Sequence, residues 1–309
     1  MSTGGPHGAR LYDRRPVVVG LVGCGLWGIN VLRDLRTLDC AVRVVARSEA
    51  SVARACEGGA AEVVGELESL GQVDAIVVVV PVEAHAGVLE SVLAVDVPVF
   101  IEKPLCADAA AATRFAARAP ERLFVMDKWR YHPAIAALRE ISENESLGRT
   151  RGLRTVRVQS GNRHHADAGW VLAPHDLSIA LEIFGEVPRP TAAVGQWETG
   201  RLVTMHALLE ATCRWHALEV SERAGAAERR VELHCDDGVV VLGGGWDEHV
   251  QVHRRDGGTE RIETPGELPL LAELRAFVEF VRGGPPPRSS AAEGAAVVEA
   301  IAALRALAA

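Results

Sequence analysis

The stretch VVVGLVGCGLWG, residues 17–28, decides the fold. Its first half is an almost unbroken apolar run, which is typical of a strand buried on both faces of a parallel sheet. Gly23, Gly25 and Gly28 then form a GxGxxG pattern between that strand and a helix-spaced segment. In this context the glycines permit a tight turn, close approach of the backbone to a pyrophosphate and close helix–strand packing, while the helix N-terminus faces the anion. The stretch therefore predicts a bound dinucleotide.

Outward from this stretch, strands and helices alternate. Apolar segments at 41–48, 73–81 and 97–101 read as further strands, and helix-spaced segments separate them. Strict alternation indicates right-handed βαβ units and a doubly wound parallel sheet. The 309 residues suit two domains. The predicted divisions are a tail at 1–14, a dinucleotide-binding domain at 15–128, a substrate and oligomerisation domain at 129–284, and a linker with a closing helix at 285–309.

Composition excludes several classes of function. The net charge is −8, which disfavours a nucleic-acid partner. The six cysteines form no CxxC pair, so they read as reduced thiols of a cytoplasmic protein and not as a disulfide framework or a zinc site. No apolar run reaches the roughly 18–20 residues of a membrane span, and the first residues lack the apolar core of a signal peptide.

The end of the second predicted strand bears on the choice of cofactor. Arg47 and Ser48 stand where a carboxylate would bind the ribose 2′-hydroxyl of NAD. A guanidinium there can pair with a 2′-phosphate, and a hydroxyl can donate to it. This arrangement favours NADP, with NAD as the alternative because Glu49 follows directly.

Four further segments carry a resemblance to a known family. They are EKPL at 102–105, PVEAHAGVLESVL at 81–93, KWRYHPAIAALREI at 128–141 and LAPHDLSIALEIFG at 172–185. Together with the glycine motif they resemble the Gfo/Idh/MocA oxidoreductases, most closely the branch that acts on nucleotide-linked or amino sugars. The resemblance runs from about Val17 to the C-terminal helix. It implies a Rossmann domain followed by an α+β domain with an open, mostly antiparallel sheet, and a homodimer or homotetramer formed through the free face of that sheet.

The resemblance also implies a catalytic pair. Lys103 matches the lysine that lies beside the nicotinamide, and His175 matches the histidine that takes or returns the hydroxyl proton. Without the motif, Lys103 would read as an ion-pair partner of Glu102, and His175 as a core histidine. The adjacent Asp176 is expected to cap the following helix or to hold the imidazole.

One position departs from the family pattern. Most relatives have an aspartate four residues before the histidine, and this chain has Val171. Valine supplies no charge, so we expect His175 to be neutral at pH 7 and Lys103 to donate the proton in the reducing direction. We also expect a substrate that is apolar at this point, such as a deoxy-sugar ketone or an imine.

The sequence thus predicts an NADP-dependent oxidoreductase that acts on a sugar-like carbonyl or alcohol in biosynthesis. The alternatives are an imine reductase of the same fold and a non-redox dinucleotide-binding protein. No metal site is expected, because His164 and His165 are adjacent and no carboxylate or cysteine completes a set. The predicted cofactor contacts are Gly23, Gly25, Leu26, Trp27, Gly28, Arg47, Ser48, Pro81, His85, Glu102 and Lys103. The predicted substrate contacts are Arg130, Tyr131, Arg163, His164, Val171 and His175.

Overall fold

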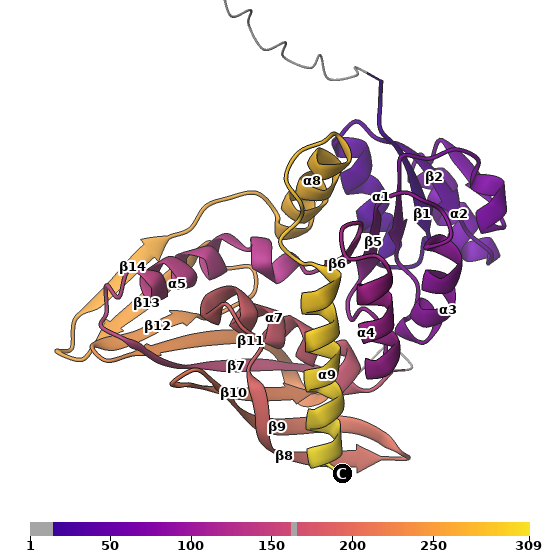
Figure 1. The fold of residues 1–309 in the computed structure, drawn as a ribbon. Coiled ribbons are helices and arrows are strands. Elements are labelled where there is room, and N and C mark those ends of the chain that lie inside the picture. The colour runs from indigo at the N-terminus through magenta and orange to yellow at the C-terminus, as the bar shows by residue number, and fades with distance from the viewer. Residues whose placement is uncertain (1–14, 162–165) are drawn as a thin grey trace, which may run out of the picture.

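The computed structural model describes residues 15–161 and 166–309. Two sheets organise this part of the chain, and helices lie on both (Figure 1). Among the described residues, no helix combines the length and the apolar character that crossing a bilayer requires.

The first sheet has six parallel strands, as predicted, in the order β3-β2-β1-β4-β5-β6. The order reverses between β1 and β4, and open sheets of this kind bind ligands outside the carboxyl ends of the strands at such a point. The strands are β1 (Val18–Val22), β2 (Ala41–Val45), β3 (Glu62–Val64), β4 (Ala75–Val78), β5 (Val99–Glu102) and β6 (Leu123–Met126).

Short connections and helices join these strands. Buried apolar residues cover both faces of this sheet. In β4, for example, all four residues are buried, as expected of a parallel strand with helices on both sides. The helical elements are α1 (Gly28–Thr37), α2 (Glu49–Glu57), η1 (Leu67–Leu70), α3 (Val82–Val92), α4 (Ala109–Arg118) and η2 (Lys128–Tyr131).

The second sheet has eight strands in the order β14-β13-β12-β11-β7-β10-β9-β8. Every neighbouring pair is antiparallel except β7 and β10, which confirms the expected mostly antiparallel sheet. The strands are β7 (Thr150–Ser160), β8 (Arg189–Glu198), β9 (Arg201–Ala211), β10 (Arg214–Ser221), β11 (Arg223–Cys235), β12 (Gly238–Leu242), β13 (His249–Arg254) and β14 (Thr259–Glu263).

Helices cover one face of this second sheet. They are α5 (Pro133–Glu143), α6 (Ala168–Val171) and α7 (Ala173–Phe184). In α7 every residue except His175 is buried, so this helix lies inside the domain. No helix of the described chain lies on the opposite face (Figure 1).

The last two helices join the halves of the molecule. The sequence placed α8 (Pro269–Val281) with the second domain, but its apolar face packs on the first sheet, where Phe277 stacks on Phe100 with ring centroids 4.7 Å apart. Helix α9 (Ala291–Leu307) begins with a Ser290–Glu293 capping box and runs beside α4 (Figure 1). Both helices therefore fix how the two sheets face each other.

Candidate active site

The glycine loop after β1 has the geometry that a pyrophosphate requires. Gly23 has φ +98°, and an added Cβ would lie 2.3 Å from the Val79 carbonyl oxygen. A Cβ on Gly28 would lie 2.6 Å from the Gly23 oxygen, whereas a Cβ on Gly25 would meet no atom within 4 Å. Helix α1 has no side-chain cap and no acidic residue in its first turn. Backbone N–H groups and open space thus meet at this point, and the residues fit a dinucleotide.

At the end of β2, the predicted contacts already have partners within the protein. Arg47 forms an ion pair with Glu66, with Nη2 and Oε2 2.7 Å apart, and both side chains are mostly exposed. The Ser48 hydroxyl caps α2 by accepting a hydrogen bond from the Ser51 N–H. Glu66 could not be predicted from local sequence, because the η1 region that follows it is brought beside β2 only by the fold.

Lys103 follows β5 and reaches from the first domain to the second. Its Nζ donates to the Val171 carbonyl oxygen at 3.1 Å and lies 3.9 Å from the Glu102 carboxylate. Local sequence leaves that oxygen free, because Pro174 has no N–H and the His175 N–H donates to Leu172 at 3.3 Å. A backbone carbonyl thus meets Lys103 at the position where relatives have an aspartate, while the valine side chain packs on the hydrophobic core.

His175 lies in the first turn of α7, beside this contact. Burial, together with the charges of Lys103, Arg157, Lys128 and Arg229, lowers its pKa well below the usual range. Its Nδ1 is buried and has no hydrogen-bond partner in the described chain. The imidazole is therefore neutral at pH 7, in the direction that the sequence predicted, and its Nδ1 is left for another group.

Asp176 has neither of the roles expected for it. Its carboxylate accepts two hydrogen bonds from Arg157 of β7, at 2.9 and 3.2 Å, and both side chains are almost wholly buried. The Arg157 guanidinium also lies over the Trp129 ring, 4.5 Å from its centroid. The pair ties α7 to the second sheet, so the first turn of α7 and the His175 backbone are held in place.

Sequence reasoning missed a group of buried charges behind Lys103. Burial raises the pKa of Asp127 to about 7 and raises that of Glu273 well above its usual range. Burial lowers the pKa of Lys128, whose Nζ lies 4.5 Å from the Trp27 ring centroid. Asp127 directly follows β6, and that position at the carboxyl end of a parallel strand was the available signal.

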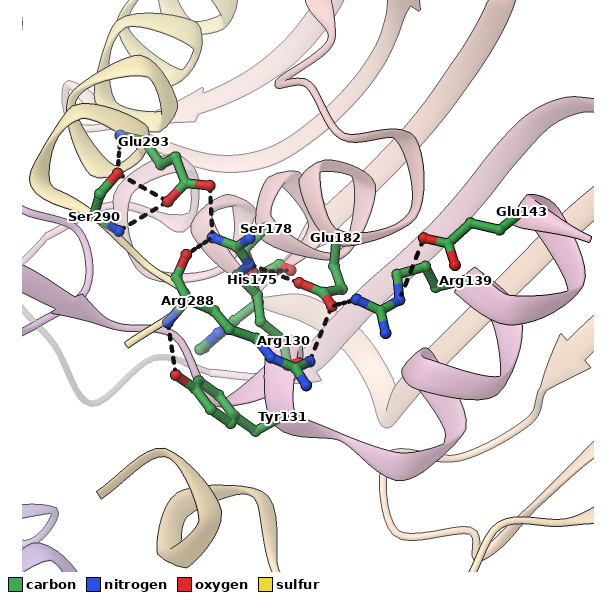
Figure 2. A network of polar contacts seen from close by, with 10 residues as sticks. All are labelled: Arg130, Tyr131, Arg139, Glu143, His175, Ser178, Glu182, Arg288, Ser290 and Glu293. Atoms are coloured by element: carbon green, nitrogen blue, oxygen red, sulfur yellow. Dashed lines mark hydrogen bonds and ion pairs between the residues drawn. The ribbon is translucent and has the colours of Figure 1, made fainter. Parts of the chain in front are cut away.

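Arg130 and Tyr131 lie in a network that joins η2, α7 and the segment before α9 (Figure 2). Arg130 Nε donates to Glu182 at 2.9 Å, and its Nη1 lies 3.0 Å from the Glu293 carboxylate. The Tyr131 hydroxyl accepts from the Arg288 N–H at 2.9 Å. Arg288 and Arg139 also donate to Glu182, each at 3.0 Å. These contacts hold the α7 helix of His175 against the element that follows β6.

The remaining predicted residues are placed as follows. Pro81 precedes α3, and Leu26 is largely exposed. His85 is buried, with Nδ1 2.8 Å from the Pro104 oxygen and Nε2 3.0 Å from the Val80 oxygen. Arg163 and His164 lie outside the described residues. Within residues 15–161 and 166–309, no three histidine, cysteine, aspartate or glutamate side chains gather as metal ligands.

Comparison with known proteins agrees with this geometry. Residues 17–126 match the Gfo/Idh/MocA family model, described as an oxidoreductase family with an NAD-binding Rossmann fold. Inositol 2-dehydrogenase 1 of Saccharopolyspora erythraea is 30% identical over 298 residues, which cover 91% of this chain and 79% of that protein.

Two solved structures share the fold. UDP-N-acetylglucosamine 3-dehydrogenase from Acidithiobacillus ferrooxidans matches with a TM-score of 0.82 and 22% identity, over 95% of this chain and 98% of the other. A 3-ketoreductase from Actinomadura kijaniata, solved as a lysine-to-alanine variant with TDP-benzene and NADP, matches with a TM-score of 0.84 and 22% identity, over 94% and 98%. At these identities the likeness shows the fold alone.

Proposed function

The chain belongs to the Gfo/Idh/MocA family of NAD(P)-dependent oxidoreductases, and from this premise we propose that it transfers a hydride between NADP and a sugar-like ketone or alcohol. One observation carries the proposal. Lys103, at the carboxyl end of the dinucleotide-binding sheet, donates at 3.1 Å to Val171, the last residue of α6, four residues before His175 in the first turn of α7. A cationic proton donor and a neutral imidazole thus meet where the two domains face each other.

The site supplies what such a reaction needs from a protein. Bound dinucleotide provides the hydride donor or acceptor. When an alcohol is oxidised, its carbon loses a hydride and its hydroxyl loses a proton, and a neutral His175 is able to take that proton. When a ketone is reduced, a neutral imidazole has only a weakly acidic proton to give, so Lys103 is the donor to the developing alkoxide.

The finer cofactor preference rests on Arg47. An exposed ion pair such as Arg47–Glu66 is worth only ~0–1 kcal/mol, so a doubly charged 2′-phosphate is able to displace Glu66. A charge-assisted contact to the phosphate is worth about 1.5–3 kcal/mol. This balance supports NADP over NAD.

The substrate class follows from position 171. The Val171 side chain packs on apolar neighbours, so it offers no hydrogen-bond partner to a substrate hydroxyl. A hydroxyl buried there without a partner costs ~1–3 kcal/mol. This supports a deoxy-sugar ketone or an imine in place of a fully hydroxylated polyol.

The test is a titration followed by turnover. Quenching of protein fluorescence should show binding of NADPH, and oxidation of NADPH should then follow with keto-deoxy-sugars and cyclic imines more readily than with the ketone of inositol. Absence of dinucleotide binding, or turnover best with the fully hydroxylated ketone, would contradict the proposal.

We also propose that the protein forms a homodimer or homotetramer through the helix-free face of the second sheet. That face presents exposed Val194, Leu208 and Trp215. Light scattering of the native protein and of Leu208→Glu should show an assembly in the first and a monomer in the second. A monomeric native protein would contradict this proposal.

A further inference from the structure

Two arginines lie directly opposite each other on the helix-covered face of the second sheet, which we call its inner face. The antiparallel register of β7 and β11 pairs Arg157 with Arg229. Paired residues on adjacent strands point to the same face, and Arg157 reaches α7, so Arg229 also points toward the helix that carries His175. Like charges placed directly opposite each other destabilise a sheet. This pairing therefore needs a compensating anion.

Arg157 already has an anionic partner within the protein. Arg157 takes both oxygens of Asp176 and rests on the Trp129 ring. Both Arg157 and Asp176 are at least nine-tenths buried, so this pair is closed to other partners.

Arg229 is held only by neutral acceptors. Its Nη1 donates to the backbone oxygens of Val158 at 2.6 Å and Glu228 at 2.8 Å, and its Nη2 donates to the Gln159 side chain at 2.8 Å. In the described chain no carboxylate forms an ion pair with it. Burial and the neighbouring Arg157 lower the pKa of Arg229, and the Asp176 charge offsets only part of this effect. The guanidinium is thus oriented in advance by neutral acceptors and has no direct ion-pair partner among the described residues.

The position of Arg229 relates it to the candidate active site. Its charge acts on both His175 and Asp176. The loop after β12 packs against it so tightly that a Cβ on Gly245 would lie 3.2 Å from the Arg229 Cβ and 3.0 Å from the Trp129 ring. Because Gly245 has no Cβ, the loop can pack directly against one side of Arg229.

We propose that Arg229 binds an anionic group of the substrate, a carboxylate or a phosphate, on the inner face of the second sheet beside His175. The inference deepens the proposed function and rests on it, because it takes this region as the substrate side of the site. A sugar acid and a phosphorylated or nucleotide-linked sugar share the required charge. The anion neutralises the unpaired arginine and orients the reacting carbon toward Lys103 and His175.

The experiment compares probes that differ in charge. Protein saturated with NADPH is titrated by calorimetry with D-glucuronate, D-glucose and inorganic phosphate. Glucuronate and glucose share a ring and differ at one carbon, so their comparison isolates the carboxylate, and phosphate tests the second source of charge. We expect glucuronate or phosphate to bind at least about tenfold more tightly than glucose, as one charge-assisted contact predicts.

Arg230 provides a matched control. It is the next residue on β11, points to the opposite face and pairs with Glu232 at 2.5 Å. Arg229→Gln should weaken anion binding about tenfold or more, Arg229→Lys should restore part of it, and Arg230→Gln should leave it unchanged. Circular dichroism and the NADPH dissociation constant of each variant show whether the fold is retained.

The outcomes separate this inference from the proposed function. Equal affinity for glucuronate, phosphate and glucose, or anion binding that survives in Arg229→Gln, overturns the anion site even if NADPH binds and sugars are turned over. Failure of NADPH to bind overturns the proposed function, and the difference between wild type and Arg229→Gln in phosphate binding still decides the role of Arg229.

Discussion

Lys103 donates a hydrogen bond to a backbone oxygen. This contact bears on which residue gives the proton and which takes it in the proposed reaction. A carbonyl accepts a hydrogen bond without adding a charge, so the contact does not favour an imidazolium at His175, which four neighbouring cations already disfavour. An aspartate side chain at position 171 would add the missing negative charge.

The variant Val171→Asp tests the proposed roles of Lys103 as proton donor and His175 as proton acceptor. Its carboxylate should raise the pKa of His175 toward its usual range, because an adjacent negative charge stabilises the imidazolium. In the pH–rate profile the apparent pKa assigned to His175 should therefore move upward relative to wild type, and hydroxylated substrates should gain relative turnover. If both the profile and the substrate preference match wild type, position 171 does not contribute to the site.

The buried histidine His216 predicts how stability depends on pH. Burial lowers the pKa of His216 from 6.5 to about 3, and its Nε2 lies 2.9 Å from the Thr155 hydroxyl. Between these pKa values the unfolded chain binds a proton that the folded protein does not. The stabilisation is therefore complete above pH 6.5 and is lost as pH falls toward 3, by ~1.4 kcal/mol per pH unit.

The measurement compares wild type with His216→Gln, which keeps a partner for Thr155. Urea unfolding at pH 6.5 and 4.5 should show that wild type loses about 2–3 kcal/mol more than the variant over this interval. Taking the difference removes the opposing effect of the buried carboxyls. Parallel losses in the two proteins would mean that His216 is not buried in its neutral form.

Sequence motifs pointed to the candidate site residues but not to their partners in the fold. Lys103, His175 and Val171 were identifiable because each lies in or beside a local pattern. Arg157 and Arg229 were not, because their contact depends on the register of two strands that are far apart in the sequence. Asp176 forms an ion pair with β7 and does not cap a helix because α7 packs on that strand, which local sequence does not show.

At the scale of elements, the connection from β2 to α2 carries the proposed preference for NADP. NADPH should bind at least tenfold more tightly than NADH, and Arg47→Ala should abolish the difference. Glu66→Gln should increase the preference, because it removes the carboxylate that competes with the 2′-phosphate for Arg47. Fluorescence titration with NADPH and with NADH measures this preference. Equal dissociation constants in wild type would contradict the proposed choice of NADP.

The strands that are hard to predict from the sequence are short or polar. Strands β3 and β6 have three and four residues, too few for a periodic pattern to stand out. Strand β14 reads TERIE, whose charged residues hide a strand at the edge of the sheet. Longer strands such as β9 are recognisable because apolar and polar residues alternate over much of their length.

At the scale of the whole molecule, two helices and one network hold the domains in a single arrangement. Helix α8 packs on the first sheet, α9 runs beside α4, and Glu182 of α7 accepts hydrogen bonds from three arginines (Figure 2). An amphipathic pattern shows that a helix has a buried face but not which sheet covers it, so the position of α8 was beyond the sequence.

In the proposed mechanism, this arrangement brings Lys103 and His175 together for proton transfer next to a bound dinucleotide. The most direct test measures kcat and the NADPH dissociation constant of Lys103→Ala on the substrate found by the turnover panel. The account predicts that kcat falls by ~10²–10⁴ while the dissociation constant stays within about threefold, with His175→Ala showing the same division in the oxidising direction. Full turnover by Lys103→Ala would contradict the account.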